Sequence, residues 1–318
     1  MLATADVRRA ARRVAAYVRR TRLVPSARPG LWLKLENEQV SGAFKARGAA
    51  SALTALSAAQ RAAGVVTHSS GNHGRALGEV GAALGVDVTV VVPDTAMPHK
   101  VQAVRDTGAT VVVVPVAERA SAAGELVAAG MTFVPPFDHL DVMAGQGTAA
   151  LELLEQAHVA GVTVRRVWAP VGGGGLLSGT AVALVRTGVE VVGVEPALAG
   201  DFAASVAAGE LVAWDVADTV RTVADGLRLP SVGRLPWEHL SCLGVGAVTV
   251  EEDEIMRATH WLAQQGVVAE PSGAVSVAGA LAQMGQPEGG IDVAIVSGGN
   301  VAPTTEDGTG GADRGGTR

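Results

Sequence analysis

Short Val-rich runs separated by longer Ala-rich stretches limit the possible folds of this chain more than any other feature. The apolar runs at 64–69, 87–93, 110–116, 165–171, 190–195 and 291–296 alternate with segments of helical period. Buried parallel strands form such continuous hydrophobic runs, and their alternation with helices is typical of βαβ units. We therefore expect an α/β fold with right-handed connections.

The alternation occurs in two blocks, which predicts two doubly wound α/β domains. The small domain is expected to span residues 46–140, and the large domain to combine 1–45 with 141–303. Among the helices, we expect one to begin at Gly42, one to span 72–84 and one to begin at Gly145. Residues 304–318 contain no apolar anchor and are expected to be a disordered tail. The periodicity of residues 196–250 is weaker, so no elements are predicted there.

Composition argues against several classes of protein. The formal net charge of −6 gives no electrostatic footprint for nucleic acid or an anionic membrane. The arginines of the first 22 residues recur at helical spacing, which indicates a solvated helix face. No apolar run is long enough to cross a membrane. A single cysteine, Cys242, excludes an intrachain disulfide. We expect a cytoplasmic protein.

Four motifs follow predicted strands and carry the candidate chemistry. Lys45 lies in Ser41–Ala49 (SGAFKARGA), where a strand passes into a helix. The others are Ser69–Gly74 (SSGNHG), the four-glycine loop 172–175 and Ser297–Asn300 (SGGN). Loops at the carboxyl ends of parallel strands form the crevice in which α/β proteins bind ligands. Each motif alone is also compatible with an ordinary turn, so their common placement and order decide the interpretation.

The glycine loop lets the backbone approach a phosphate closely, and the helix after it favours an anion. It lacks the Gly-x-Gly-x-x-Gly spacing of dinucleotide sites, and no Gly-Lys-Ser/Thr follows it. NAD and nucleoside triphosphates are therefore disfavoured.

In this order the motifs resemble those of the serine/threonine dehydratase and serine racemase group, which are fold type II pyridoxal-phosphate (PLP) enzymes with the fold of the tryptophan synthase β-subunit. The resemblance covers nearly the whole chain apart from the tail. It implies that Lys45 carries PLP as a Schiff base and that Phe44 packs against the ring. Asn72 would bind the ring 3′-oxygen, and Ser297 would face the ring nitrogen. The phosphate would be cradled by Gly172, Gly173, Gly174 and Gly175.

The resemblance also implies a reaction. Lys45 would remove the Cα proton of a 3-hydroxy amino acid, and β-elimination would yield a 2-oxo acid and ammonia. The substrate carboxylate would be bound, through side chain or backbone, by Ser69, Ser70, Asn72 and His73. Like the dehydratases, and unlike the cysteine synthases, the chain carries His73 rather than a threonine. A homodimer is expected from the same resemblance.

Three alternatives remain open. Ser70 matches the serine with which serine racemases act on the opposite face of the substrate, so racemisation is one alternative. Hydroxyaspartate dehydratases keep this serine too and form the second. The third is a non-catalytic PLP-binding protein that retains the fold.

A metal site is also implied by the resemblance. In serine racemase-like members, residues matching Glu195, the backbone carbonyl of Ala199 and Asp201 bind a divalent cation. Oxygen ligands of this kind suit Mg²⁺ or Ca²⁺. A solvated acidic loop is the competing interpretation. Glu270 matches a glutamate near the cofactor in this group, and a structural role for it is equally compatible with the sequence.

Overall fold

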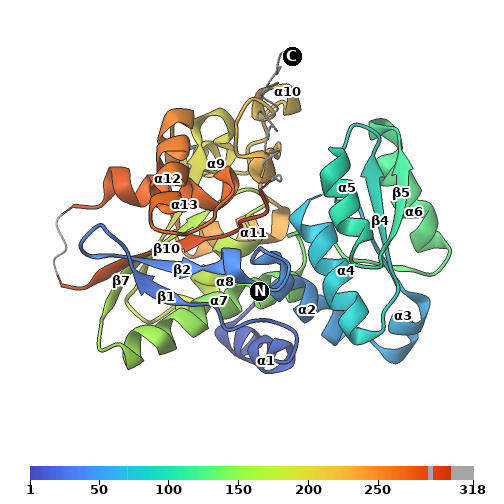
Figure 1. The fold of residues 1–318 in the computed structure, drawn as a ribbon, viewed down its shortest axis with the longest axis horizontal. Coiled ribbons are helices and arrows are strands. Elements are labelled where there is room, and N and C mark those ends of the chain that lie inside the picture. Colours follow the sequence, from blue (N-terminus) through green and yellow to red (C-terminus); the bar gives the residue numbers. More distant parts are fainter. Residues whose placement is uncertain (70, 286–288, 302–318) are drawn as a thin grey trace, which may run out of the picture.

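The computed structural model describes residues 1–69, 71–285 and 289–301, and it contains two β-sheets flanked by helices (Figure 1). The α/β class predicted from the sequence is confirmed. No helix of the described residues is long and apolar enough to cross a membrane. The predicted tail, 304–318, lies outside the described residues.

The larger sheet has six strands in the order β1-β2-β10-β7-β8-β9. The short β1 pairs antiparallel with β2, and the other pairs are parallel. Its strands are β1 (Leu23–Pro25), β2 (Leu31–Leu35), β7 (Val164–Pro170), β8 (Glu190–Pro196), β9 (Gly246–Val250) and β10 (Ile291–Val296). The central strand β10 is buried along most of its length, as expected for a sheet covered on both faces.

The smaller sheet is entirely parallel, with the order β5-β4-β3-β6. Its strands are β3 (Val65–Thr67), β4 (Val88–Pro93), β5 (Thr110–Val114) and β6 (Thr132–Phe133). All four belong to one continuous stretch of chain, whereas the larger sheet takes strands from both sides of that stretch. Figure 1 shows the smaller sheet with its helices as a separate lobe.

Helices cover the faces of both sheets. They are α1 (Thr4–Val14), α2 (Lys45–Ala55), α3 (Ala58–Ala63), α4 (Asn72–Leu84), α5 (Pro98–Arg105), α6 (Arg119–Ala128), α7 (Leu140–Val159), α8 (Gly175–Leu184), α9 (Asp201–Ala208), α10 (Val216–Thr219), α11 (Arg234–Cys242), α12 (Glu252–Gln264) and α13 (Pro271–Gln283). Short 3₁₀ turns are η1 (Glu36–Glu38), η2 (Val116–Glu118), η3 (Ala197–Ala199) and η4 (Asp225–Leu227). Helix α13 packs on the larger sheet, and α2 contacts both α4 and α7, so α2 joins the two lobes.

Two predicted helices begin at other residues than expected. Helix α2 begins at Lys45 rather than Gly42, because the preceding residues pair instead with the chain after β10 through an Ala43–Gly298 bridge. Helix α7 begins at Leu140 rather than Gly145. Its first turn is capped by the residue before it, since the imidazole Nδ1 of His139 accepts from Asp141 N at 3.2 Å.

Residues 4–14 of the basic N-terminal segment form α1, as the helical spacing predicts, whereas the arginines at 19, 20 and 22 lie beyond its end. The helix buries Val7, Ala10 and Val14 against the rest of the protein. Its arginines flank this buried stripe, and most of them are exposed.

Candidate functional site

The four motifs meet at the carboxyl ends of the strands. Ser69 and Asn72 follow β3, the loop 172–175 follows β7, and Ser297 follows β10. Strands β7 and β10 are neighbours in the larger sheet, so their loops adjoin. Asn72, from the lobe built on β3, hydrogen-bonds directly to Glu270 and Asn300 of the larger lobe. The structure therefore brings residues from both lobes to one place.

Lys45 is the first residue of α2, and its side chain is directed toward the 136–137 segment. Its Nζ donates to the carbonyl of Pro136 at 2.8 Å and lies 5.0 Å from the centroid of the Phe44 ring. Burial lowers the pKa of the Lys45 amine from 10.5 to about 8. The positive end of the α2 dipole also disfavours a cation at this position. An appreciable fraction of the amine is thus neutral near pH 8.

Backbone contacts attach the Lys45 segment to the Ser297 segment. Phe44 N donates to Ser297 O at 2.9 Å, and Gly299 N donates to Gly42 O at 2.9 Å. Gly42 has a φ of +73°, and a Cβ there would lie 2.2 Å from the Asn300 side-chain oxygen. Only glycine fits this turn without strain. Ser297 itself is buried beside the turn.

Asn72 connects the small lobe to the large one. Its amide donates to Glu270 Oε1 at 2.5 Å, and its side-chain oxygen accepts from Asn300 Nδ2 at 2.7 Å. Burial raises the pKa of Glu270 to about 7. Asn300 also donates to Ser41 O at 2.9 Å. Glu270 therefore lies within the site and touches a residue predicted to bind the cofactor.

The glycine loop is shaped by close neighbours. A Cβ at Gly173 would lie 2.1 Å from the ring of Phe137, and Gly174 has a φ of +80°. Side chains are therefore excluded at these two positions, and the backbone leads directly into α8. The first N–H groups of a helix lack partners within it and favour an anion. A loop of this geometry fits a phosphate group.

His73 is buried in the small lobe, and the partner of its imidazole fixes where the ring proton lies. Nε2 lies 3.1 Å from Val134 O, an acceptor, so Nε2 carries the proton. Burial first, and then the charge of Lys45, lower the pKa of His73 to about 3. Nδ1 has no hydrogen-bond partner among the described residues. Like Nδ1, a carboxylate can only accept hydrogen bonds, so these two groups cannot bond to each other. The backbone N–H of His73 is therefore the group of this residue that is available to bind a carboxylate.

Ser69 lies beside the start of α4, and Ser70 lies outside the described residues. A Cβ at Gly74 would come within 2.2 Å of Ser69 O, so glycine is required for the close turn there. The first N–H groups of α4, like those of any helix, have no partner within the helix.

Glu195 and Asp201 form a second cluster, beside β8. Both carboxyl groups are buried, and the Glu195 oxygens accept from Phe202 N at 3.1 Å and Ala203 N at 2.8 Å. Burial raises the pKa of both groups, and the charge of Asp201 raises that of Glu195 further. Asp201 Oδ2 has no partner among the described residues. Ala199 is buried in the η3 turn between them.

Sequence reasoning missed several residues that surround the site. Pro136 and Phe137 carry no glycine or strand-end signal, and η4 lies in the segment whose periodicity is too weak to interpret. Gly226 N of η4 donates to Ser272 Oγ at 2.9 Å, and Leu227 lies against Gly172.

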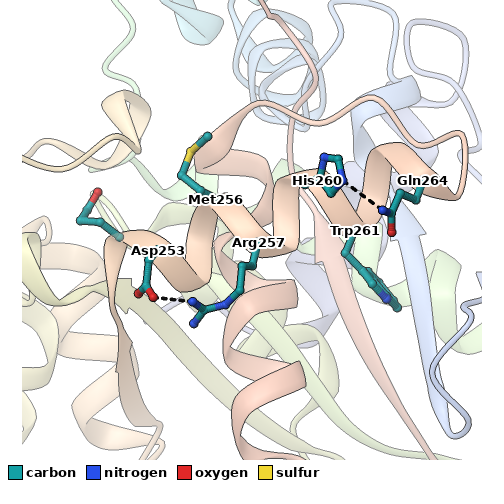
Figure 2. Close-up of a pocket in the computed structure, with 7 residues that line it drawn as sticks. Asp253, Met256, Arg257, His260, Trp261 and Gln264 are labelled. Carbon is teal, nitrogen blue, oxygen red and sulfur yellow. Dashed lines mark hydrogen bonds and ion pairs between the residues drawn. The ribbon is translucent and has the colours of Figure 1, made fainter.

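A separate shallow groove runs along the surface of α12. Figure 2 shows Asp253 paired there with Arg257, and His260 with Gln264. None of the four motifs lines that groove.

Comparisons with known proteins point to one enzyme family. The profile of a family described as "Pyridoxal-phosphate dependent enzyme" matches residues 14–299. L-threo-3-hydroxyaspartate ammonia-lyase of Saccharomyces cerevisiae is 36% identical, with 93% of this chain and 92% of that protein covered. Serine racemase of Dictyostelium discoideum is also 36% identical, with 93% and 94% covered. The crystal structure of a T.th. threonine deaminase superposes with a TM-score of 0.88 at 38% identity, covering 94% of this chain and 99% of that one.

Proposed function

The chain belongs to the family of pyridoxal-phosphate-dependent enzymes, and from this premise we propose that it is an ammonia-lyase that converts serine or threonine to a 2-oxo acid and ammonia. The observation that carries the proposal is the Lys45 amine. It lies between both lobes, and burial keeps its pKa at about 8. An amine held partly neutral in this way can bind a carbonyl group and later accept a proton.

The residues around Lys45 fit PLP. Gly172 to Gly175 and the start of α8 would hold its phosphate, and Phe44 would pack on the ring. Asn72 would bind the ring oxygen, and the Ser297 hydroxyl would face the ring nitrogen. When bound, PLP stabilises negative charge at the substrate Cα. We also propose that Glu270, which accepts from Asn72, fixes the orientation of that amide.

Lys45 would remove the Cα proton from the substrate. The N-terminal turn of α4, with Ser69, Ser70, Asn72 and His73, would bind the substrate carboxylate through N–H groups and hydroxyls. His73 Nδ1, a neutral acceptor, can receive a hydrogen bond from a hydroxyl or an ammonium group but cannot donate one. This arrangement would orient the Cα–H bond toward Lys45, on one face of the substrate.

Two cationic side chains close to the site, Lys100 and Arg75, already have hydrogen-bond partners, which favours an uncharged substrate side chain. Lys100 pairs with Asp225, and Arg75 Nη1 donates to Asn300 Oδ1 at 2.7 Å. A second carboxylate, as in 3-hydroxyaspartate, would have to compete with these partners and lose its own hydration. We therefore rank serine and threonine above 3-hydroxyaspartate as substrates.

Racemisation is the second candidate, and the identity to a serine racemase favours it specifically. It requires proton-transfer groups on opposite faces of the substrate. We propose Lys45 for one face and Ser70 for the other.

One experiment separates these activities. Release of 2-oxo acid is measured from L-serine, L-threonine, D-serine and 3-hydroxyaspartate side by side, and residual serine is analysed for chirality. We expect L-serine and L-threonine to be the best substrates. A clear preference for 3-hydroxyaspartate would overturn the ranking, and inverted serine without 2-oxo acid would replace the lyase with a racemase. Absence of all products in a protein that still shows a PLP absorbance band would favour the non-catalytic PLP-binding protein.

We also propose the remaining properties implied by the resemblance. Mg²⁺ or Ca²⁺ would bind Glu195, the Ala199 carbonyl and Asp201. The protein would be a cytoplasmic homodimer, with domain boundaries at 1–45 plus 141–303 and at 46–140. The orphaned Asp201 oxygen and the oxygen-only donor set support the metal proposal.

A further inference from the structure

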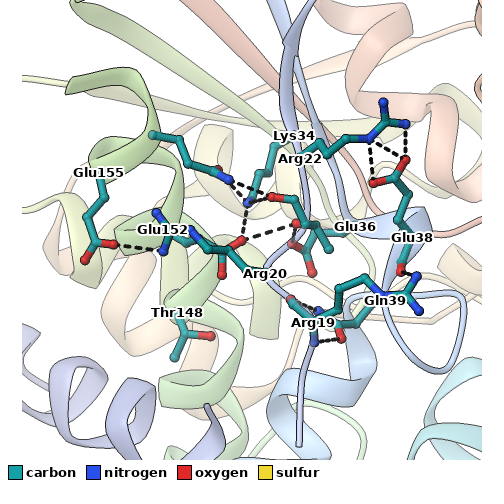
Figure 3. Close-up of polar contacts among 12 residues, drawn as sticks. Arg19, Arg20, Arg22, Lys34, Glu36, Glu38, Gln39, Thr148, Glu152 and Glu155 are labelled. Atoms are coloured by element: carbon teal, nitrogen blue, oxygen red, sulfur yellow. Dashed lines mark hydrogen bonds and ion pairs between the residues drawn. The ribbon is translucent and has the colours of Figure 1, made fainter. Parts of the chain in front are cut away.

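A network of four buried charged side chains lies behind Lys45, on the side of α2 away from the crevice. Its members are Lys34, Glu36, Arg47 and Glu152, and their side chains are 0%, 0%, 1% and 11% exposed. Figure 3 shows Lys34, Glu36 and Glu152 together, with the more exposed pairs Arg20–Glu155 and Arg22–Glu38 around them. Two cations and two carboxylates balance one another.

Arg47 is the member with the most directional contacts. Its Nε and Nη2 each lie 2.7 Å from a different oxygen of Glu36, a two-bond fork. Its Nη1 and Nη2 contact Glu152 at 3.2 Å, and Nη1 contacts Thr148 Oγ1 at 3.3 Å. Burial alone would raise the pKa of Glu36, but Arg47 first, together with Lys34 and Thr21, holds the pKa below its ordinary value. Bidentate pairs of this kind restrict orientation as well as distance.

The network is attached to Lys45 through the helix itself. Arg47 follows Lys45 by two positions, which places their side chains on opposite sides of the first turn of α2. Glu36 directly follows β2, and β2 pairs with β10, the strand that ends beside Ser297. Phe44 N, on the other side of Lys45, is bound to Ser297 O. The residues flanking Lys45 are therefore both fastened to adjacent strands of the same sheet.

We propose that Arg47 is a positioning residue for Lys45: the fork to Glu36, supported by Glu152, fixes the first turn of α2 and thereby the place of the Lys45 amine. This inference rests on the proposed function. Stability alone accounts poorly for the network, because well-packed apolar residues commonly replace buried ion pairs without loss of stability. Catalytic groups, in contrast, must be held within about 0.5 Å of their working position.

Glu36 and Glu152 allow the two roles to be separated. Glu152 is the salt-bridge partner of Lys34, at 2.5 Å, and makes the longer contacts to Arg47, so Glu152→Gln should lower the melting temperature with little displacement of Lys45. Glu36 makes the shorter contacts to Arg47, so Glu36→Gln should displace Lys45 more than Glu152→Gln does. If the network serves stability alone, the position of Lys45 should instead follow the melting temperature in both variants.

The test uses the PLP-loaded protein and four variants, Arg47→Lys, Glu36→Gln, Glu152→Gln and the control Asp292→Asn. Asp292 is also buried and bound by an arginine, with Arg165 Nη2 at 2.7 Å. It lies five residues before Ser297, about 16 Å away along an extended strand. Three quantities are measured: the fraction of Lys45 labelled after borohydride reduction, the pH midpoint of the cofactor absorbance band, and the melting temperature.

We expect Arg47→Lys and Glu36→Gln to shift the pH midpoint by about one unit and to lower the labelled fraction. Their kcat should fall about 10- to 100-fold, with a smaller change in KM. Asp292→Asn should lower the melting temperature without moving the midpoint.

The inference is overturned if the midpoint and labelling stay unchanged in the folded Arg47 and Glu36 variants, or if they follow the melting temperature across all four proteins. Should Arg47→Lys not fold, Glu36→Gln decides. Absence of Lys45 labelling in the unmodified protein would instead overturn the proposed function.

Discussion

Lys45 and Arg47 are inward-facing basic side chains on opposite sides of one helical turn, and their surroundings shift the pKa of each in opposite directions. Arg47 has two carboxylate partners, Glu36 and Glu152, and these raise its pKa despite burial. Among the described residues, the hydrogen-bond partner of Lys45 is neutral, the Pro136 carbonyl, and burial lowers the pKa of Lys45 to about 8. The same helix therefore holds one side chain permanently charged and leaves the other able to lose its proton.

The difference shows that carboxylate partners can outweigh the effect of burial on a pKa, as they do at Arg47; at Lys34 burial still lowers the pKa despite its pair with Glu152. The balanced network on the sheet side of α2 needs no ligand. On the crevice side, the charge of the Lys45 amine is not balanced by a carboxylate partner among the described residues. In the acidic pair beside β8, Asp201 Oδ2 likewise lacks a partner among them. Unbalanced groups of this kind are the ones for which a ligand or cofactor is proposed here.

Replacement of Lys45 is expected to have the largest effect, and it tests the crevice side of α2. Lys45→Ala should abolish turnover and the PLP absorbance band, because no other amine is held at this position. Loss of a nucleophile or base that cannot be replaced costs at least about 10⁴-fold in rate. Borohydride labelling followed by peptide mapping measures the attachment directly. Label on Lys34 or Lys100 in the unmodified protein would contradict the assignment.

The elements that could be predicted to the residue are those with local signals at both ends. Helix α4 spans the predicted Asn72–Leu84 because Gly71 and Gly85 flank it, the latter with a φ of +65°. The prediction for the start of α7 is wrong for the opposite reason. Gly145 suggests a helix end, but a Cβ there would lie 2.4 Å from Arg47 O, so this glycine allows α2 to pack closely. A glycine needed for packing cannot be told from a terminator by sequence alone.

The motifs of the site could be predicted, but their partners could not. Asn72 and Glu270 are 198 positions apart, and Arg47 and Glu152 are 105 apart. Such pairs depend on how the two lobes and α7 are placed, and no local period encodes that. Lys34 and the glutamate two residues later alternate with leucines like the exposed residues of an ordinary strand, although the structure buries both. Their burial follows from the position of α7.

The pH dependence of the unfolding free energy tests the same comparison between Lys45 and Arg47, and the expected effect is smaller. Between pH 8 and 10.5 the unfolded chain retains the Lys45 proton and the folded, PLP-free protein loses it, so stability should rise with pH in this window. Lys45→Met removes the contribution. The unfolding free energy of the unmodified protein minus that of Lys45→Met should therefore rise from pH 8 to 10.5, by at most about 3 kcal/mol.

Denaturant unfolding of both PLP-free proteins at several pH values measures this slope. Asp292→Asn is the control, because it disturbs a buried ion pair while it retains every amine of the protein, and it should keep the slope of the unmodified protein. A difference that is flat from pH 8 to 10.5 would mean that the Lys45 amine is not shielded from water in the folded state.

The smallest predicted effect concerns the acidic pair beside β8, where a cation bound from solution would balance the charge of the two carboxylates. Mg²⁺ or Ca²⁺ should raise the melting temperature, because a ligand that binds only the folded state stabilises it, by about 2.7 kcal/mol at a concentration 100 times its Kd. Asp201→Asn should remove most of the response, since Asp201 supplies the oxygen without a partner. Asp253→Asn, at the exposed pair with Arg257, is the matched control and should leave the response intact. Equal responses in both variants would show that the cation acts elsewhere, and the acidic pair would then be a buried, protonated contact within the core.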